Sequence, residues 1–339
     1  MSKAMQSLSL ISVILVASVA AGCGTDDETF QKSDVSKNTA KTPAAEVAAT
    51  PPAREPGVTV PETPLPPRVV TYEEAEAAYH AGRYDEASTL FARYVELKPG
   101  NPWGHYMLGL SAWKAGNLES AEESLRRAIA LDTTHVKGHV NLARVLLQAG
   151  RPGEAYTAVD NALVLDEVSA DAWRVKGRVC HDLGRADEAV AAYKQAIRLD
   201  PEDAWSMNNL AYLWIQQERF DEALGPLARA VELRGDVAVF HNNLGMALER
   251  TGHQQAAEEA YAAAVAADPA YRRAALNGER IAAVHKEPDV SPVDLTARAQ
   301  AFAGEIESWT PEALASATPP ASDAVTPIRA EPDSTGSDR

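Results

Sequence analysis

The residue types that most often carry catalysis are present in this chain, but they form no recognisable active-site pattern. His135 and His139 are four residues apart, a spacing that can hold a metal ion when both lie on one helix face. They straddle the start of an expected helix, so we predict no metal site there. The adjacent carboxylates Asp187 and Glu188 lie where a helix should begin, where negative charge suits the helix dipole. The chain also lacks a glycine-rich phosphate loop, HExxH, CxxC and GxSxG. We therefore predict no catalytic residue, metal, cofactor or small-molecule substrate.

The N-terminus carries the one pattern that predicts a covalent modification. Lys3 is followed by an apolar run over residues 8–21, which is too short to cross a bilayer and fits the core of a signal peptide. The run ends in VAAG directly before Cys23, which resembles the bacterial lipobox, where a signal peptidase cleaves before a cysteine that carries lipid. We predict that residues 1–22 are removed and that Cys23 is lipidated. The alternative is an ordinary secretory signal peptide followed by an incidental cysteine.

The destination of such a lipoprotein depends on the residues near the modified cysteine. Gly24 follows Cys23, so the aspartate that retains lipoproteins in the inner membrane of enteric bacteria is absent. We therefore expect the outer membrane of a bacterial envelope, with the protein facing the periplasm. Several acyl chains would anchor it stably, whereas one alone is marginal. The other cysteine, Cys180, lies in the middle of the chain, so no disulfide framework is predicted.

The central part of the chain repeats itself every 34 residues without an insertion. The turn column of this repeat consists of Gly82, Gly116, Gly150, Gly184, Glu218 and Gly252. Five residues after each of these lies an alanine: Ala87, Ala121, Ala155, Ala189, Ala223 and Ala257. Seven residues before each lies another small residue: Ala75, Gly109, Ala143, Gly177, Ala211 and Gly245. A period of this length is typical of a stacked helical solenoid rather than of one globular core.

Each unit is predicted to be a helix, a turn centred on the glycine column and a second helix. In the fourth unit the first helix is expected over residues 171–182 and the second over residues 187–199. Glycine at the turn can adopt the left-handed conformation that closes a helix C-terminus. The small columns let the paired helices approach closely, and the connectors that contain Pro99, Pro201 and Pro269 help to stop the second helices.

These columns resemble those of tetratricopeptide repeat (TPR) proteins. The stretches GRYDEASTLFARYVELKPGN, GRADEAVAAYKQAIRLDPED and ERFDEALGPLARAVELRGDV are similar to the second half of that repeat, and DAWRVKGRVCHDLG and VFHNNLGMALERTG are similar to its first half. Tyr94 stands where alanine is usual, Glu218 replaces the turn glycine, and only Trp173 keeps the early tryptophan. The resemblance implies an all-α, right-handed solenoid over residues 68–286, with a capping helix at 272–286. Its six repeats would be 68–101, 102–135, 136–169, 170–203, 204–237 and 238–271.

Both flanks of the predicted solenoid have the composition of disordered segments. Residues 23–67 are rich in Thr, Ala, Pro, Glu and Asp and contain few large apolar residues, so we expect a linker between the lipid and the solenoid. Residues 287–339 are similar and form an acidic tail. Within this tail, apolar residues spaced three or four apart predict a short amphipathic helix over 293–309. They are Leu295, Ala299, Phe302, Ile306 and Trp309.

The resemblance also implies that the first helices of the repeats line a concave groove. The family's groove positions correspond to Trp103, Trp113, Lys137, Asn141, Arg144, Arg174, Arg178, Trp205, Asn209, Tyr212 and Asn243. Arginines suit carboxylates, and asparagine amides can both donate to and accept from a peptide backbone. We therefore expect a protein or peptide partner, acidic where it meets the four cations; the alternative is a solvated face with scattered charges. The net charge of −16 argues against nucleic acid.

Together these features predict a membrane-anchored adaptor of the bacterial envelope that binds another protein. It looks most like the TPR lipoproteins that assist pilus or secretion machines, including pilotins. An alternative is an adaptor that recruits peptidoglycan hydrolases or synthases. An enzyme would need a convergent set of titratable residues in a pocket, and the sequence shows none. A competing occupant of the groove is the chain's own acidic tail around Glu305 and Trp309.

Overall fold

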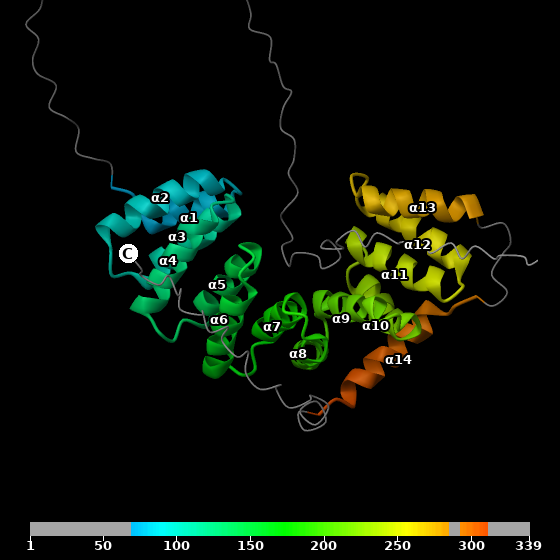
Figure 1. The fold of residues 1–339 in the computed structure, drawn as a ribbon. Helices are drawn as coiled ribbons and strands as arrows, with labels where there is room; N and C mark the ends of the chain where they lie inside the picture. The colour runs from blue at the N-terminus through cyan, green and yellow to red at the C-terminus, as the bar shows by residue number, and fades with distance from the viewer. Residues whose placement is uncertain (1–68, 285–291, 311–339) are drawn as a thin grey trace, which may run out of the picture.

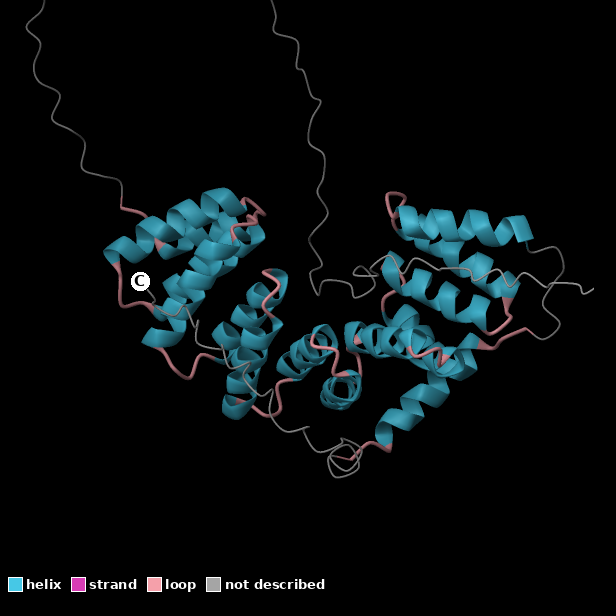
Figure 2. Ribbon diagram, in the orientation of Figure 1, coloured by secondary structure: helices cyan, strands magenta, loops and turns pink. Residues whose placement is uncertain are grey.

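The helices of this chain follow one another in pairs along an arc (Figure 1). The computed structural model describes residues 69–284 and 292–310, and these residues form fourteen α-helices and no strand (Figure 2). The all-α fold of stacked helix pairs predicted from the 34-residue period is therefore confirmed. None of the helices in the described ranges is both long and apolar enough to cross a bilayer. The helices are α1 (Tyr72–His80), α2 (Tyr84–Leu97), α3 (Pro102–Lys114), α4 (Leu118–Leu131), α5 (Val136–Gln148), α6 (Pro152–Leu165), α7 (Ala170–Asp182), α8 (Ala186–Leu199), α9 (Ala204–Gln216), α10 (Phe220–Leu233), α11 (Ala238–Arg250), α12 (Gln254–Ala267), α13 (Arg272–Val284) and α14 (Leu295–Glu307).

The two helices of a repeat begin in different ways. Most first helices have a polar side chain at the N-cap; for example, Asn101 Oδ1 accepts a hydrogen bond from the backbone N–H of Gly104 at 2.9 Å. Several second helices instead follow an arginine that makes no side-chain cap. That arginine pairs with a glutamate of the first helical turn: Arg83 with Glu86, Arg151 with Glu154, Arg185 with Glu188, and Arg219 with Glu222. The carboxylates at this position are thus helix-end charges, as the sequence indicated.

The turn within each repeat has the left-handed conformation that its glycine predicts. The five turn glycines have φ between 72° and 88°. In the fourth repeat the N–H of Gly184 donates to the carbonyl of His181 at 2.9 Å, and the N–H of Arg185 donates to that of Cys180 at 2.8 Å, which closes α7. Glu218 adopts the same conformation, with φ of 60°, and is the one non-glycine residue with a positive φ in the described part of the chain. A side chain in this region is strained.

The small column of the first helix is matched to the large residue that it meets on the second helix. A Cβ atom added to Gly177 would lie 2.6 Å from the ring of Tyr193, and one added to Gly245 would lie 2.7 Å from the ring of Tyr261. Both tyrosines are fully buried. The tyrosine therefore occupies the space that the missing side chain leaves, which explains why this column stays small.

The first helices lie on the inside of the arc. Each one contacts the first helix of the next repeat, from α1 and α3 through to α11 and α13. The second helices of neighbouring repeats make no such contact with one another within the described ranges. Stacked pairs that are closer together on one side must curve toward that side. The first helices therefore line the concave face and the second helices the convex face, as expected from the resemblance.

The buried core is divided near the middle of the array. One cluster of buried apolar side chains runs from Ala75 to Val179, and another from Cys180 to Trp309. The two clusters meet in α7, and Tyr156 packs against both of them. Burial raises the pKa of the Cys180 thiol to about 12, so this cysteine is an apolar core residue.

Beyond the last repeat, α13 packs on α11 and α12 as the expected cap, whereas α14 folds back along the chain. The predicted tail helix is present, and it contacts the second helices α10 and α8 on the convex face (Figure 1). A Cβ atom added to Gly225 of α10 would lie 3.2 Å from Cβ of Phe302, and Arg298 pairs with Asp221 at 2.8 Å. The alternative in which this segment occupies the concave groove is therefore wrong. Phe302, Ile306 and Trp309 bury their apolar stripe against the convex face instead.

Candidate functional site

The groove residues that the sequence predicted all lie on first helices, namely α3, α5, α7, α9 and α11. The structure differs from expectation in how those residues are engaged. The predicted lipidation site Cys23, the signal peptide 1–22 and the linker 23–67 lie outside the described residues.

The asparagines of the concave face form hydrogen bonds between neighbouring repeats. Nδ2 of Asn243 donates to Oδ1 of Asn208 at 2.9 Å, and Nδ2 of Asn277 donates to Oδ1 of Asn242 at 3.0 Å. The partners in each pair are 35 residues apart, because neighbouring first helices approach one another on the inside of the arc. Asn209, which is 1% exposed, accepts from Asn208 at 3.2 Å. We expected these amides to face a bound peptide, and the structure turns them toward each other.

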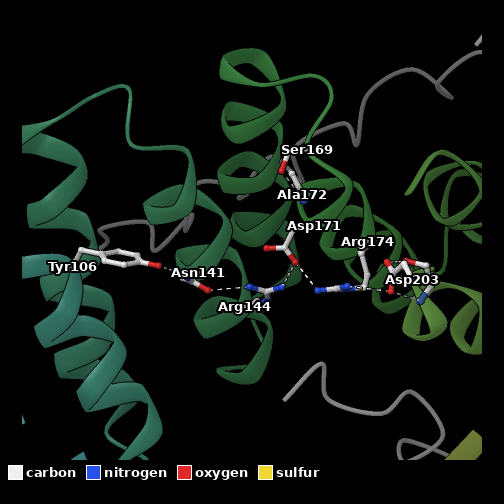
Figure 3. A network of polar contacts seen from close by, with 9 residues as sticks. Tyr106, Asn141, Arg144, Ser169, Asp171, Ala172, Arg174 and Asp203 are labelled. Carbon is white, nitrogen blue, oxygen red and sulfur yellow. Dashed lines mark hydrogen bonds and ion pairs between the residues drawn. The ribbon is translucent and has the colours of Figure 1, made fainter. Parts of the chain in front are cut away.

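In the middle of the face an ionic chain crosses three repeats (Figure 3). Nη1 of Arg144 donates to Oδ1 of Asn141 at 3.0 Å, and Nη2 of Arg144 donates to Oδ1 of Asp171 at 2.5 Å. The same oxygen of Asp171 accepts from Nη2 of Arg174 at 2.5 Å, and Nη1 of Arg174 donates to Oδ1 of Asp203 at 3.1 Å. At the other end Asn141 donates to the hydroxyl of Tyr106 at 2.9 Å. Together with Tyr106, the residues of this ionic chain thus link helices α3, α5, α7 and α9.

The two aspartates of the ionic chain differ in exposure. The side chain of Asp203 is 3% exposed and also caps α9 through Ser206, so it belongs to the framework. The side chain of Asp171 is 46% exposed, while Arg144 and Arg174 are 17% and 20% exposed. Burial would raise the pKa of Asp171, but Arg144 and Arg174 outweigh that effect and hold the pKa below its usual value. Asp171 is therefore an ionised carboxylate that solvent can reach.

The four predicted groove cations are not equivalent. Arg144 and Arg174 belong to the ionic chain, and Arg178 pairs with Asp182 at 3.2 Å. Lys137 is exposed and has no ion-pair partner among the described residues. From the sequence we predicted the cations of this face but not the carboxylates of Asp171 and Asp203 that pair with two of them. The signal was available, because Asp171 lies three residues before Arg174, where helical side chains meet.

The aromatic residues of the concave face range from exposed to buried. Trp103 is 50% exposed and packs against His135, with 4.6 Å between the ring centroids. Nε1 of Trp113 donates to Oε1 of Gln148 at 2.7 Å, and Trp205 is half-buried against Phe240. Tyr212 is only 3% exposed. Trp103 is therefore the aromatic residue most available to a partner, and Tyr212 is a core residue.

The two histidines that resembled a metal pair are structural. Nδ1 of His135 accepts from the N–H of Gly138 at 3.1 Å and caps α5, and burial lowers the pKa of both His135 and His139. Nowhere in the described ranges do three His, Cys, Asp or Glu side chains gather closely enough to hold a metal ion.

Comparison with known proteins identifies the repeat. Three family models, each of them a tetratricopeptide repeat, match the chain over most of the array and over more than half of its length. The matched segments are 70–102, 106–155 and 140–204 for the first model, 181–243 for the second and 238–271 for the third. None of the curated proteins matches the chain.

Solved structures share the arrangement of the helices at low sequence identity. PilW, described as a widely conserved type IV pilus biogenesis factor, is 19% identical with a TM-score of 0.55, over 60% of this chain and 94% of its own. PilF of Pseudomonas aeruginosa is 21% identical with a TM-score of 0.50, over 61% of this chain and 90% of its own. A chain of the APC/C hetero-tetramer Cut9-Hcn1 is 15% identical with a TM-score of 0.56, over 61% of this chain. The present chain spans only 41% of that longer one. These similarities concern the fold.

Proposed function

Because the chain belongs to the tetratricopeptide repeat family, whose members are in general non-enzymatic scaffolds for protein–protein interaction, we propose that it is a lipid-anchored adaptor that holds a partner protein on its concave face. Cys23 would carry the lipid, and the linker over residues 23–67 would separate the array from the membrane. The partner would be an extended segment or a helix of another protein, the two shapes that such a groove accommodates.

One row of side chains on the concave face carries the proposal. Trp103, Lys137 and Asp171 occupy the same position in three successive repeats, one helix apart, on α3, α5 and α7. Trp103 and Lys137 are exposed and the side chain of Asp171 is half exposed, although the helices that bear them are buried on their other faces. An exposed tryptophan beside charged groups supplies both apolar contact and polar specificity, as the central residues of protein interfaces do.

The charge around this row favours an acidic segment of the partner. Lys137, Arg144 and Arg174 surround Asp171, and Lys137 and both arginines act on the carboxylate. With Asp203 counted, three cations face two carboxylates, which leaves a local positive excess on a chain whose net charge is −16. A carboxylate of the partner would be attracted to Lys137 and to the guanidinium groups beside it.

For the cellular role we propose assembly of a pilus or a secretion machine at the outer membrane, on the periplasmic side. The proposal is supported by the lipobox-like end of the N-terminal apolar run. It is also supported by the fold shared with PilW and PilF, nearly all of whose lengths are matched. The role described for PilW is pilus biogenesis.

Site-specific crosslinking tests the concave face. The photo-crosslinking residue p-benzoylphenylalanine replaces Trp103 in one variant and Arg127 in another, and each variant is irradiated in the native host. Arg127 is an exposed residue of α4 on the convex face, so it is the matched control. A partner should be captured from position 103 and not from position 127. Lys137→Glu should abolish this capture, and Arg127→Glu should leave it unchanged. Equal capture from both positions would refute the assignment.

Metabolic labelling tests the anchor. An alkyne fatty acid should label the wild-type protein and not Cys23→Ala, and the wild type should sediment with outer membranes. Equal labelling of the two proteins would show that Cys23 carries no lipid. The labelling result does not depend on whether a partner occupies the groove, so the two halves of the proposal can fail separately.

A further inference from the structure

Most of the exposed large apolar side chains lie at two of the connectors between repeats. Seven such side chains are exposed in the described ranges, and five of them lie in or beside the connectors at residues 98–101 and 166–169. The five are Leu97, Trp103, Val164, Leu165 and Val168. Val164 is 83% exposed and Val168 is 64% exposed. Apolar side chains that gather on an exposed surface mark an interaction site.

The fold of the repeat does not require Val164 and Val168. The same positions hold charged residues in the fourth and fifth repeats, namely Arg198, Glu202, Glu232 and Asp236. An exposed valine in place of an exposed charge removes a solvated group from the surface and stabilises no core. The two valines therefore distinguish the third connector from the next two for a reason other than packing within the array.

Hydrogen bonds hold the connector that carries these valines. The N–H of Val168 donates to Oδ1 of Asp166 at 3.2 Å, and Nε1 of Trp173 donates to the carbonyl of Glu167 at 2.8 Å. The connector at residues 98–101 is held in a similar way, because Nε2 of His105 hydrogen-bonds to the carbonyl of Pro99 at 3.1 Å. Both connectors are thus ordered surfaces whose conformation need not change on binding.

The two connectors carry opposite charges beside their apolar side chains. Lys98 occupies the position that Asp166 occupies two repeats later, and Glu167 follows Asp166. None of these three side chains makes an ion pair with another described residue. At the first connector the nearby charges of Arg93 and Glu96 offset each other, so the charge of Lys98 remains. At the other, Asp160 is paired with Lys176, so the charges of Asp166 and Glu167 remain.

We call the two surfaces the basic patch (Leu97, Lys98 and Pro99) and the acidic patch (Val164, Asp166, Glu167 and Val168). The basic patch borders a shallow depression of about 530 Å³ that residues 97–103 line. The exposed aliphatic side chains of the acidic patch have the size and polarity to fill such a depression. The two patches are therefore complementary in both charge and apolar character.

Both patches lie on the same edge of the array. Each repeat is an antiparallel helix pair and the pairs stack in one orientation, so the connectors follow one edge and the glycine turns follow the other. The distance between the patches is the same in every copy of the chain. Two copies placed edge to edge in opposite directions therefore bring each basic patch to an acidic patch of the other copy. This is the arrangement of an isologous dimer with two-fold symmetry.

We propose that this edge is a dimer interface, in which each patch binds the opposite patch of a second copy of this chain. Leu97 and Pro99 would pack against Val164 and Val168, and Lys98 would pair with Glu167. The two carboxylates of the acidic patch disfavour an anionic membrane surface as its occupant. The inference goes beyond the proposed adaptor function and does not depend on what the concave face binds.

Mixed cysteine variants test the arrangement. Full-length Lys98→Cys and full-length Glu167→Cys are purified separately, mixed, and oxidised with copper phenanthroline. We expect a disulfide-linked dimer from the mixture and not from either variant alone, because position 98 of one copy faces position 167 of the other. The wild type treated in the same way controls for Cys23, and Cys180 is buried. Equal products from the mixture and from either single variant would overturn the proposed pairing.

Apolar variants test what holds the two copies together. Val164→Asp combined with Val168→Asp in the Glu167→Cys chain should lower the yield of the linked dimer at least about tenfold, because the burial of two valines is lost. Leu276→Asp changes an exposed leucine of the cap and is the matched control, which should leave the yield unchanged. Circular dichroism checks that these variants of exposed residues remain folded. An unchanged yield with the two aspartates would overturn the inference.

Charge reversal tests the ion pair without a crosslink. In sedimentation velocity of the full-length protein, Lys98→Glu and Glu167→Lys should each weaken dimerisation about fivefold, as expected for an exposed pair that occurs twice in the dimer. An equimolar mixture of the two variants should dimerise like the wild type, because the mixed dimer contains one native and one reversed pair. Arg127→Glu on the convex face is the control and should have no effect.

A wild-type protein that stays monomeric up to about 200 µM would overturn the inference and leave the two patches to another protein or to the membrane. That result would not affect the adaptor function, which photo-crosslinking from position 103 tests. There, a product of twice the mass of the chain marks a second copy, and a product of another mass marks a partner. Absence of a partner would in turn leave the dimer unaffected.

Discussion

Buried amides join neighbouring first helices in repeats 5 and 6 and the cap, whereas arginines and aspartates join them in repeats 3 to 5. In the C-terminal half the hydrogen bonds Asn208–Asn243 and Asn242–Asn277 involve Asn208 and Asn242, both at 0% exposure, and only Asn277 is partly exposed. In the N-terminal half the central acceptor is Asp171, whose side chain is half exposed. The change of chemistry falls close to α7, where the two core clusters also meet.

The contacts between first helices therefore depend on salt, pH and bound ligands in the N-terminal half but not in the C-terminal half. The strength of a hydrogen bond between two buried, neutral side-chain amides depends little on salt or pH. Breaking it leaves a buried N–H donor without a partner. An exposed carboxylate between two guanidinium groups can exchange with solvent ions or with a partner's carboxylate, because its replacement leaves no charge stranded. The half that carries the proposed groove row is therefore the half whose internal bonds a ligand can replace.

The largest expected effect comes from the column of small residues that both halves of the array share, and it tests whether that column tolerates a larger side chain. Ala189 of α8 is fully buried in the core cluster that begins at Cys180, so Ala189→Leu inserts a side chain where there is no space. We expect a loss of about 3 kcal/mol in the free energy of unfolding, the upper end for overpacking. Ala130→Leu, on the exposed side of α4, is the control and should change it by less than about 0.5 kcal/mol. Urea denaturation followed by circular dichroism measures both; equal midpoints would show that the column tolerates volume.

The next effect tests the C-terminal half, in which asparagine side chains join the first helices. Asn208→Ala removes the acceptor of Asn243 and leaves a buried N–H group unsatisfied. The expected loss is about 2 kcal/mol, and it should be the same at low and high salt. Asn161→Ala, an exposed amide of α6, is the control. A loss that shrinks as salt is added would mean that the amide half also depends on charge.

A smaller effect, below about 1 kcal/mol, is expected for Asp171→Asn because the carboxylate is half exposed. Its pKa is lower in the folded state than in the unfolded state, so its contribution is complete above the unfolded value of about 4 and disappears as the pH falls through the folded value. The difference in urea midpoint from the wild type should therefore shrink below about pH 4 and in high salt. A difference that persists at pH 2 would argue against an ionic role.

The smallest effect is a gain in stability in the C-terminal half. Glu218→Gly removes a side chain from a left-handed backbone position but adds freedom to the unfolded chain, so we expect a net gain of about 0.5 kcal/mol. Gly184→Glu, at the equivalent turn of the preceding repeat, should lose stability. Thermal melting of the two variants provides the comparison. A loss on Glu218→Gly would indicate that the glutamate side chain makes a stabilising contribution of its own.

The periodicity of the sequence was sufficient to predict the array and its turns. Columns such as Gly184 and Ala189 encode local geometry, since a left-handed turn and a close helix pair each need a particular residue size. The partners of the groove residues could not be predicted in this way. The contact between Arg174 and Asp171 lies within one helix, but whether Arg174 also meets Asp203 at the start of the next first helix depends on the angle between successive repeats. The same holds for the hydrogen bonds of Asn208 and Asn242 to residues 35 positions further along the chain.

The surface on which α14 docks was also not predicted, although two residues of α10 indicate it in the sequence. Gly225 and Pro226 lie within α10 at positions where the second helices of other repeats have larger or better helix-forming residues. Read alone, such a pair suggests a weak helix. In the structure Gly225 lets the backbone of α14 approach closely, and Pro226 is buried. The amphipathic pattern of residues 295–309 predicted the helix but not the face of the array on which the helix docks.

The contact of α14 with α10 joins parts of the array that are far apart in the sequence. In a linear repeat array every contact is between sequence neighbours, so each repeat can unfold with the help of only the adjacent ones. The Arg298–Asp221 pair joins residues 77 positions apart and closes a ring that contains the second helix of repeat 5, all of repeat 6 and the cap. Opening any segment of this ring while α14 stays docked gains less chain entropy than opening a free end. The last third of the solenoid should therefore unfold as one cooperative block, and the free end of the array is the N-terminal one, next to the groove row.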